Sequence, residues 1–234
     1  MIRLLSAVLF VLFVFTVPAA GHDMPDRQTT LVTLVLDRTG SMDSCREQVI
    51  SGFNEYIETL KKTKDAEFLF TLILFDKYGD EHLALDIPYK AAPLNDVKPL
   101  TLETYVPRGL TPLYDAIGYG IQTTEQTKGY DKTVFVIMTD GEENSSKEFS
   151  REQIFKKIEE KKGLGNWTFA FLGAGQDAYA NSAKIGISAG NTLQYQTADT
   201  EGTFKSLGAA TSGAAASPKA STLDFFGPKE KEDD

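Results

Sequence analysis

The chain has 234 residues, 41% of them hydrophobic, which is enough to bury the core of one ordinary domain and too few for two. Its formal net charge is −9, because 33 acidic residues outnumber 24 basic ones. So acidic a chain lacks the clustered lysines and arginines that phosphate contacts need, which argues against a nucleic-acid partner. One cysteine and two histidines also exclude an internal disulfide and are too few for the common zinc sites.

The first 21 residues have the order of a secretory signal peptide. Arg3 supplies a positive flank, residues 4–17 form an apolar run, and small residues follow at 19–21. A helix over that run would be about 21 Å long, whereas the hydrocarbon core of a bilayer is roughly 30 Å thick. We therefore expect cleavage after residues 19–21 and a secreted or periplasmic mature chain with no membrane span. The alternative is a chain anchored by an uncleaved signal segment.

Short apolar runs alternate with amphipathic segments along the rest of the chain. Apolar runs of six to ten residues are typical of strands buried on both faces, and spacings of three and four are typical of helices. In chain order the pattern predicts a strand at 31–36, a helix at 44–62, strands at 66–75 and 83–87, a helix from Thr111-Pro112 onward, a strand at 133–138, a helix at 151–162, a strand at 167–172, a short helix near 176–185, a strand near 191–195 and a helix near 200–212.

Three of the predicted helices carry N-terminal signals, two of them capping boxes and one an N-cap threonine followed by proline. These signals are Ser44 with Glu47, Ser150 with Gln153, and Thr111 with Pro112. The run at 83–87 suits an edge strand that forms a hairpin with 66–75. Cys45 falls in a predicted helix, where we expect a partly buried, inert thiol.

Strands that alternate with helices imply an α/β fold, with a doubly wound, mostly parallel central sheet and helices on both faces. We assign residues 29–212 to this domain. Residues 213–234 are rich in Ala, Gly, Ser and Pro and end in KEKEDD, so we expect a disordered acidic tail. Phe225-Phe226 within it are expected to be solvated, with a docking motif as the alternative.

Two of the buried strands run directly into an aspartate. Asp37 follows LVTLVL, and Asp140 follows VFVIMT. The carboxyl ends of parallel strands share one edge of the sheet, which is where open α/β sheets bind ligands. Two carboxylates brought together there would lose hydration and repel each other, and a divalent cation would relieve both costs.

Hydroxyl groups accompany the first aspartate and a later helix. Thr39 and Ser41 follow Asp37 at intervals of two on a turn, and Thr111 stands where a helix begins. The resulting ligand set contains only oxygens, includes few charges and leaves room for water. Such a set suits Mg²⁺, with Mn²⁺ or Ca²⁺ as possible substitutes.

The pattern Asp37-x-Thr39-x-Ser41, then Thr111, then Asp140, resembles the metal-ion-dependent adhesion site of von Willebrand factor A (VWA) domains, written D-x-S-x-S, distant T, distant D. The resemblance covers about residues 29–200. It extends to bacterial and phage-type members through the segments LVLDRTGSM, ETYVPRGLTPLYDAIG, VFVIMTDGEENSS and WTFAFLGAGQDA.

The resemblance implies a role for each residue of the site. Thr39 and Ser41 would ligate the metal directly, Thr111 directly or through water, and Asp37 and Asp140 mostly through bound water. An acidic side chain of a protein partner would fill the remaining position. Thr39 departs from the usual serine but keeps the hydroxyl.

Three functions are compatible with this site. The first is a metal-dependent protein-binding (adhesion-type) module, without catalysis. The second is a scaffold or assembly factor in which the metal is structural. The third is a Mg²⁺-dependent phosphohydrolase with Asp37 as nucleophile. It is disfavoured because such enzymes usually carry an aspartate two residues later, where this chain has Thr39. Arg38 beside the site could attract an anionic ligand.

Overall fold

The computed structural model describes residues 27–64, 66–79, 83–217 and 224–227. The expected signal peptide at 1–21 lies outside these residues, as do parts of the expected tail. No helix in the described part of the chain is both long and apolar enough to cross a bilayer.

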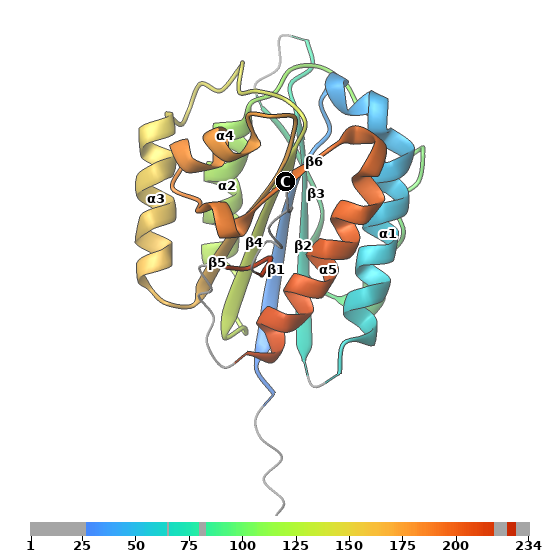
Figure 1. The fold of residues 1–234 in the computed structure, drawn as a ribbon, viewed down its shortest axis with the longest axis vertical. Coiled ribbons are helices and arrows are strands. Elements are labelled where there is room, and N and C mark those ends of the chain that lie inside the picture. Colours follow the sequence, from blue (N-terminus) through green and yellow to red (C-terminus); the bar gives the residue numbers. More distant parts are fainter. Residues whose placement is uncertain (1–26, 65, 80–82, 218–223, 228–234) are drawn as a thin grey trace, which may run out of the picture.

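A six-stranded sheet forms the centre of the molecule (Figure 1). Its order is β3-β2-β1-β4-β5-β6, and every neighbouring pair is parallel except β2 with β3, which are antiparallel. The strands are β1 (Thr29–Asp37), β2 (Glu67–Asp76), β3 (Ala84–Pro93), β4 (Lys132–Thr139), β5 (Trp167–Ala174) and β6 (Thr192–Tyr195). The predicted fold class and the edge hairpin are both confirmed.

Helices cover both faces of the sheet (Figure 1). One face carries α1 (Arg46–Lys62) and α5 (Thr200–Ala216). The other carries α2 (Leu113–Glu125), α3 (Arg151–Gly163) and α4 (Ala178–Lys184). Side chains of β1 show why its sequence is continuously apolar: Leu34 and Leu36 pack into the core under α1 and α5, and Val35 between them packs into the core under α2 and α3.

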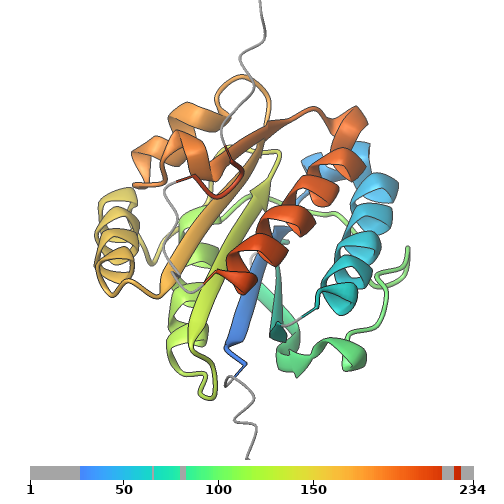
Figure 2. The same cartoon turned by 60° about the horizontal axis from the view of Figure 1, so that its bottom comes forward.

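Helices α1 and α5 lie side by side although the sequence separates them widely (Figure 2). Gly52 of α1 lies directly against the ring of Phe204, and any side chain there would collide with it. Tyr56, also in α1, shares a buried hydrogen bond of 3.1 Å with the hydroxyl of Thr211 in α5. Small residues in both helices thus allow the close approach that buries these aromatic rings.

The end of α5 corrects the predicted tail. The helix continues to Ala216, and the buried ammonium group of Lys132 at the start of β4 donates to the carbonyl oxygens of Ala214 (3.0 Å), Ala215 (2.7 Å) and Ser217 (2.6 Å). An Ala- and Gly-rich composition is typical of disorder, but here small side chains such as those of Ala214 and Ala215 pack against the core. The prediction of disorder is therefore wrong for residues 213–217.

Residues 224–227 are also part of the domain. Phe225 is only 6% exposed and packs into the core on the α5 side, and its backbone N–H donates to Oδ1 of Asn191 (3.1 Å). Phe226 packs against the same core. The expectation of solvated phenylalanines is wrong, because each ring finds apolar surface beside α5.

Only some of the predicted N-terminal capping signals are present in the structure. The capping box of Ser150 and Gln153 is present at α3, whereas Ser44 caps nothing. A 3₁₀ turn, η1 (Gly40–Cys45), precedes α1, and the Ser44 hydroxyl donates to the carbonyl of Ser41 within it (3.2 Å). Cys45 is fully buried, whereas a partly buried thiol was expected.

Lys132→Met keeps the apolar stem of the side chain and removes its ammonium group. Because three helix-end carbonyls then lose a charged donor, we expect the free energy of unfolding to fall by about 2–3 kcal/mol. Urea denaturation measures the change, and Lys128→Met at an exposed position should alter the value by no more than about 0.5 kcal/mol. Equal stability of the two variants would contradict the role of Lys132.

Candidate metal centre

The candidate site lies where the strand order reverses. From β1 the chain builds β2 and β3 on one side, and β4, β5 and β6 continue on the other. Asp37 ends β1 and Asp140 directly follows β4, and these two strands are neighbours. In doubly wound sheets the crevice for ligands opens at this switch point, beyond the carboxyl ends of the strands.

Asp37 is the buried member of the site. Its Oδ1 accepts the backbone N–H of Thr39 (2.7 Å), and its Oδ2 accepts the hydroxyl of Thr139 (2.6 Å). Burial raises the pKa of Asp37 to about 7, although these hydrogen bonds favour the carboxylate and lower it. The phenol of Tyr105 fixes the backbone of Asp37 by donating to its carbonyl oxygen (2.5 Å).

The other four residues form a chain of contacts beside it. The Thr111 hydroxyl lies 3.2 Å from that of Thr39, which lies 3.2 Å from that of Ser41. The Ser41 hydroxyl in turn donates to Oδ1 of Asp140 (2.6 Å). Burial raises the pKa of Asp140, and this hydrogen bond opposes the rise. The structure thus brings together all five residues that the sequence singled out.

Gly141 shapes the space around the hydroxyl groups. A Cβ atom at this position would lie 3.2 Å from the Thr111 hydroxyl oxygen and 3.3 Å from that of Ser41. The glycine therefore keeps open a cradle that any other side chain would fill. Its backbone N–H donates to the hydroxyl oxygen of Thr139 (3.0 Å), which fixes the glycine beside the site.

The chemistry of the donor set fits a hard divalent cation. Two carboxylates and three hydroxyls supply only oxygen ligands, with few charges and space for water, as Mg²⁺ requires. No group of three or more His, Cys, Asp or Glu side chains capable of holding a metal occurs among the described residues, so the thiolate and imidazole sites typical of zinc are not offered there.

Several residues that support the site escaped the sequence analysis. Thr139 and Tyr105 hold Asp37. Asn144 holds Thr111 from both sides, since its Oδ1 accepts the Thr111 N–H (2.9 Å) and its own N–H donates to the Thr111 carbonyl (3.1 Å). Thr139 adjoins Asp140 and could have been suspected, whereas the partners of Tyr105 and Asn144 are distant in sequence. Thr111 itself does not cap α2, which begins at Leu113.

The guanidinium of Arg38 is paired with acidic side chains that are not among the candidate metal ligands. Its guanidinium contacts Oδ2 of Asp76 at 2.7 and 2.8 Å and reaches Asp86 at 3.3 Å, and the residue is only 8% exposed. Arg108 approaches the same buried Asp76 at 3.3 Å. The sequence-based idea that Arg38 attracts an anionic ligand is not supported, because the buried carboxylate of Asp76 occupies it.

Comparison with known proteins was made by sequence and by structure. No protein-family model and no curated protein sequence matches the chain. The structure resembles that of proximal thread matrix protein 1 from the mussel byssus (TM-score 0.54, 12% identity, 80% of this chain and 46% of that one). It also resembles a von Willebrand factor type A protein from Catenulispora acidiphila (TM-score 0.55, 16% identity, 80% of this chain and 43% of that one). The vWF domain of the type V pili tip protein Mfa5 from Porphyromonas gingivalis is a further match (TM-score 0.61, 7% identity, 83% of this chain and 98% of that one).

These similarities establish the architecture: the chain has the fold of a von Willebrand factor A domain, as the sequence motifs predict. The chain spans less than half the length of the mussel and Catenulispora proteins, and almost the whole of the Mfa5 domain.

Gly141→Ala should block the metal centre and leave the fold intact. The new methyl group would occupy the space beside the Ser41 and Thr111 hydroxyls. We expect Mg²⁺ affinity, measured by titration calorimetry, to fall at least about tenfold. The matched control is Gly163→Ala at the end of α3, where a Cβ meets nothing within 4 Å. Undiminished Mg²⁺ binding by a folded Gly141→Ala variant would contradict the assignment.

A second prediction concerns pH in the metal-free protein. Folded Asp37 keeps its proton up to a pH of about 7, whereas its ordinary pKa is 3.8. Between these two pH values the folded state binds more protons than the unfolded state. Ionisation of Asp37 therefore lowers the free energy of unfolding as the pH rises from about 4 to 7, and a further rise in pH adds no further loss. Thermal unfolding in EDTA should therefore show the wild type losing stability relative to Asp37→Asn over that range. A constant difference between the two would refute the prediction.

Proposed function

We propose that this chain is a secreted or periplasmic protein-binding module of the adhesion type, which uses one divalent cation, Mg²⁺ in the first place, to capture an acidic side chain of a partner. The observation that carries the proposal is the cluster of three hydroxyls and two carboxylates at the carboxyl edge of the sheet, where Ser41 is exposed. Thr39 and Ser41 would hold the ion directly, Thr111 directly or through water, and Asp37 and Asp140 mostly through water. The bound ion would supply a positive centre for a carboxylate.

The position of Asp37 supports binding over catalysis. Both of its carboxylate oxygens already accept hydrogen bonds, and the side chain is fully buried, so it is poorly placed to attack a substrate. Ser41, in contrast, is exposed at the open side of the cluster. A site with a buried carboxylate on one side and an exposed hydroxyl on the other suits coordination of an incoming group.

The surface around the site also suits a protein partner. Most of the large hydrophobic side chains exposed in the described residues come from segments beside the metal centre: Tyr78, Leu102, Val106 and Leu110. Next to them lies a cavity of about 740 Å³, whose lining combines apolar residues such as Tyr89, Leu100 and Val106 with charged residues such as Arg38, Asp86 and Arg108. Apolar patches of this kind are typical of interaction sites and would bury against a partner as its acidic group reaches the metal.

The structural neighbours support the same interpretation. Among them are a type V pili tip protein and a proximal thread matrix protein of the mussel byssus. An extracellular or periplasmic location agrees with the signal-peptide pattern at residues 1–21. Cleavage of that segment remains part of the proposal.

The test compares peptides that differ in one acidic residue. Immobilised peptides with a central aspartate flanked by apolar residues should bind the protein in millimolar Mg²⁺ but not in EDTA, and their asparagine counterparts should not bind in either. Thermal unfolding in the same buffers reports the metal alone: Mg²⁺ at about a hundred times its dissociation constant should stabilise the fold by about 2.7 kcal/mol.

Ser41→Ala is the preferred variant for this test, because Asp37→Ala would strand the buried donors of Thr39 and Thr139. We expect it to lose both the Mg²⁺ stabilisation and the peptide binding. Metal stabilisation without carboxylate preference would overturn the capture of an acidic group and favour a structural metal. No Mg²⁺ effect in the wild type would overturn the metal centre itself.

A further inference from the structure

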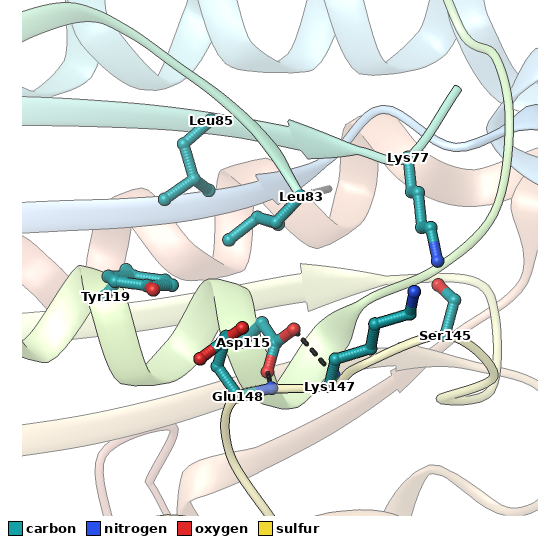
Figure 3. A pocket seen from close by; sticks show the side chains of 8 residues that line it. All are labelled: Lys77, Leu83, Leu85, Asp115, Tyr119, Ser145, Lys147 and Glu148. Carbon is teal, nitrogen blue, oxygen red and sulfur yellow. Dashed lines mark hydrogen bonds between the residues drawn. The ribbon is translucent and has the colours of Figure 1, made fainter. Parts of the chain in front are cut away.

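A second cavity, of about 440 Å³, opens beside the metal centre (Figure 3). Its walls come from the end of β2, the start of β3, helix α2 and the loop between β4 and α3. Its volume lies within the range of small-molecule sites. None of its lining residues belongs to the metal centre. They are Lys77, Leu83, Leu85, Asp115, Tyr119, Ser145, Lys147 and Glu148.

Positive charge converges at one end of this cavity. Figure 3 shows the ammonium groups of Lys77 and Lys147 and the hydroxyl of Ser145 pointing toward one another. Neither lysine forms an ion pair with a carboxylate among the described residues, although the protein as a whole is strongly acidic. Two like charges that face each other repel, and an anion between them would remove that cost.

The hydroxyl of Ser145 gives an independent indication. It is buried from solvent and has no hydrogen-bond partner, which is unfavourable for a polar group unless a ligand satisfies it. A bound anion between the two ammonium groups would accept the hydrogen bond that this hydroxyl now lacks. The orphaned group thus points to the same ligand as the two lysines.

The three groups are held on rigid backbone. Lys77 is paired with Leu110 through reciprocal backbone hydrogen bonds of 2.8 and 3.1 Å. The N–H of Ser145 donates to the carboxylate of Glu143 (2.8 Å), and the N–H of Lys147 donates to that of Asp115 (2.8 Å). Because the backbone at these positions is fixed before any ligand arrives, binding has to order only the two lysine side chains and the ligand.

The rest of the cavity limits the charge and shape of the ligand. Leu83, Leu85 and Tyr119 make one wall apolar. The carboxylate of Asp115 accepts hydrogen bonds from the backbone N–H groups of Lys147, Glu148 and Phe149, which turn its oxygens toward the loop, but it keeps its negative charge. The carboxylate of Glu148 lies at the end away from the ammonium groups (Figure 3) and would repel a second negative charge.

We propose that this cavity is a second binding site, independent of the metal, for a small monocarboxylate with an apolar body. The carboxylate would lie between Lys77 and Lys147 and accept the Ser145 hydroxyl, while the apolar part would rest against Leu83, Leu85 and Tyr119. Nothing in this site requires the cation or the proposed protein partner.

Benzoate is a suitable probe, and benzamide is its neutral counterpart of the same shape. With EDTA present, so that no carboxylate can ligate a metal, benzoate titrated into ¹⁵N-labelled protein should shift the amide signals of Lys77, Ser145 and Lys147. The expected dissociation constant is on the order of 1 mM, and benzamide should bind at least about tenfold more weakly.

Variants separate this site from general anion attraction. Ser145→Ala and Lys77→Gln should each weaken benzoate binding about tenfold, and Lys128→Gln, at an exposed lysine outside the cavity, should leave it unchanged. Ser145→Ala also removes an unsatisfied buried hydroxyl, so its melting temperature should not fall, and its loss of binding cannot be attributed to unfolding. Equal binding of benzoate and benzamide, or equal affinity in wild type and Ser145→Ala, would overturn the proposal.

Discussion

The burial of one carboxylate, Asp37, is the constraint on which the site depends. Burying a carboxylate at the end of a central strand costs much free energy of hydration, and two short hydrogen bonds only reduce that cost, so the pKa of Asp37 stays raised. The donors to Asp37 also set the geometry around it. Thr39 must turn its N–H inward, which carries its hydroxyl toward Ser41, and Thr139 must point across from β4, which places Asp140 beside the same spot.

Two further carboxylates, those of Glu143 and Asp115, hold the loop between β4 and α3 in place. Glu143 accepts the backbone N–H groups of Tyr114, Ser145 and Ser146, and Asp115 accepts three more from the same loop. These acids tie the loop between β4 and α3 to the start of α2. The arrangement resembles helix capping extended over a whole loop, since carboxylates satisfy N–H groups that no regular structure would pair. A rigid rim results, which borders both the candidate metal centre and the neighbouring cavity.

The sequence predicted most of the sheet and the proximity of the five candidate ligands, because both are governed by local patterns. Buried strands leave continuous apolar runs, and the carboxyl ends of parallel strands must share one edge, so Asp37 and Asp140 could be placed together without coordinates. The features that the sequence did not predict depend on contacts between distant segments. Neither the attachment of Asn144 to Thr111 nor the pairing of Arg38 with Asp76 leaves a sequence signal.

The error at the C-terminus has a similar physical cause. Composition alone cannot distinguish a flexible Ala- and Gly-rich segment from one whose small side chains allow a tight fit. Lys132 and Asn191, which hold that part of the chain, lie far upstream. The predicted start of α1 was wrong because a 3₁₀ turn occupies the residues that match a capping box.

The contact between Lys132 and the end of α5 bears on how the domain can move. The ammonium group lies at the start of β4, and the loop after the other end of that strand carries Asp140. Helix α5 cannot slide along the sheet without withdrawing three carbonyls from a buried charge, so small displacements are resisted and a large one requires the contact to break. Helix α5 is therefore tied to the sheet at the edge opposite the candidate metal centre, by a contact that a large displacement would have to break.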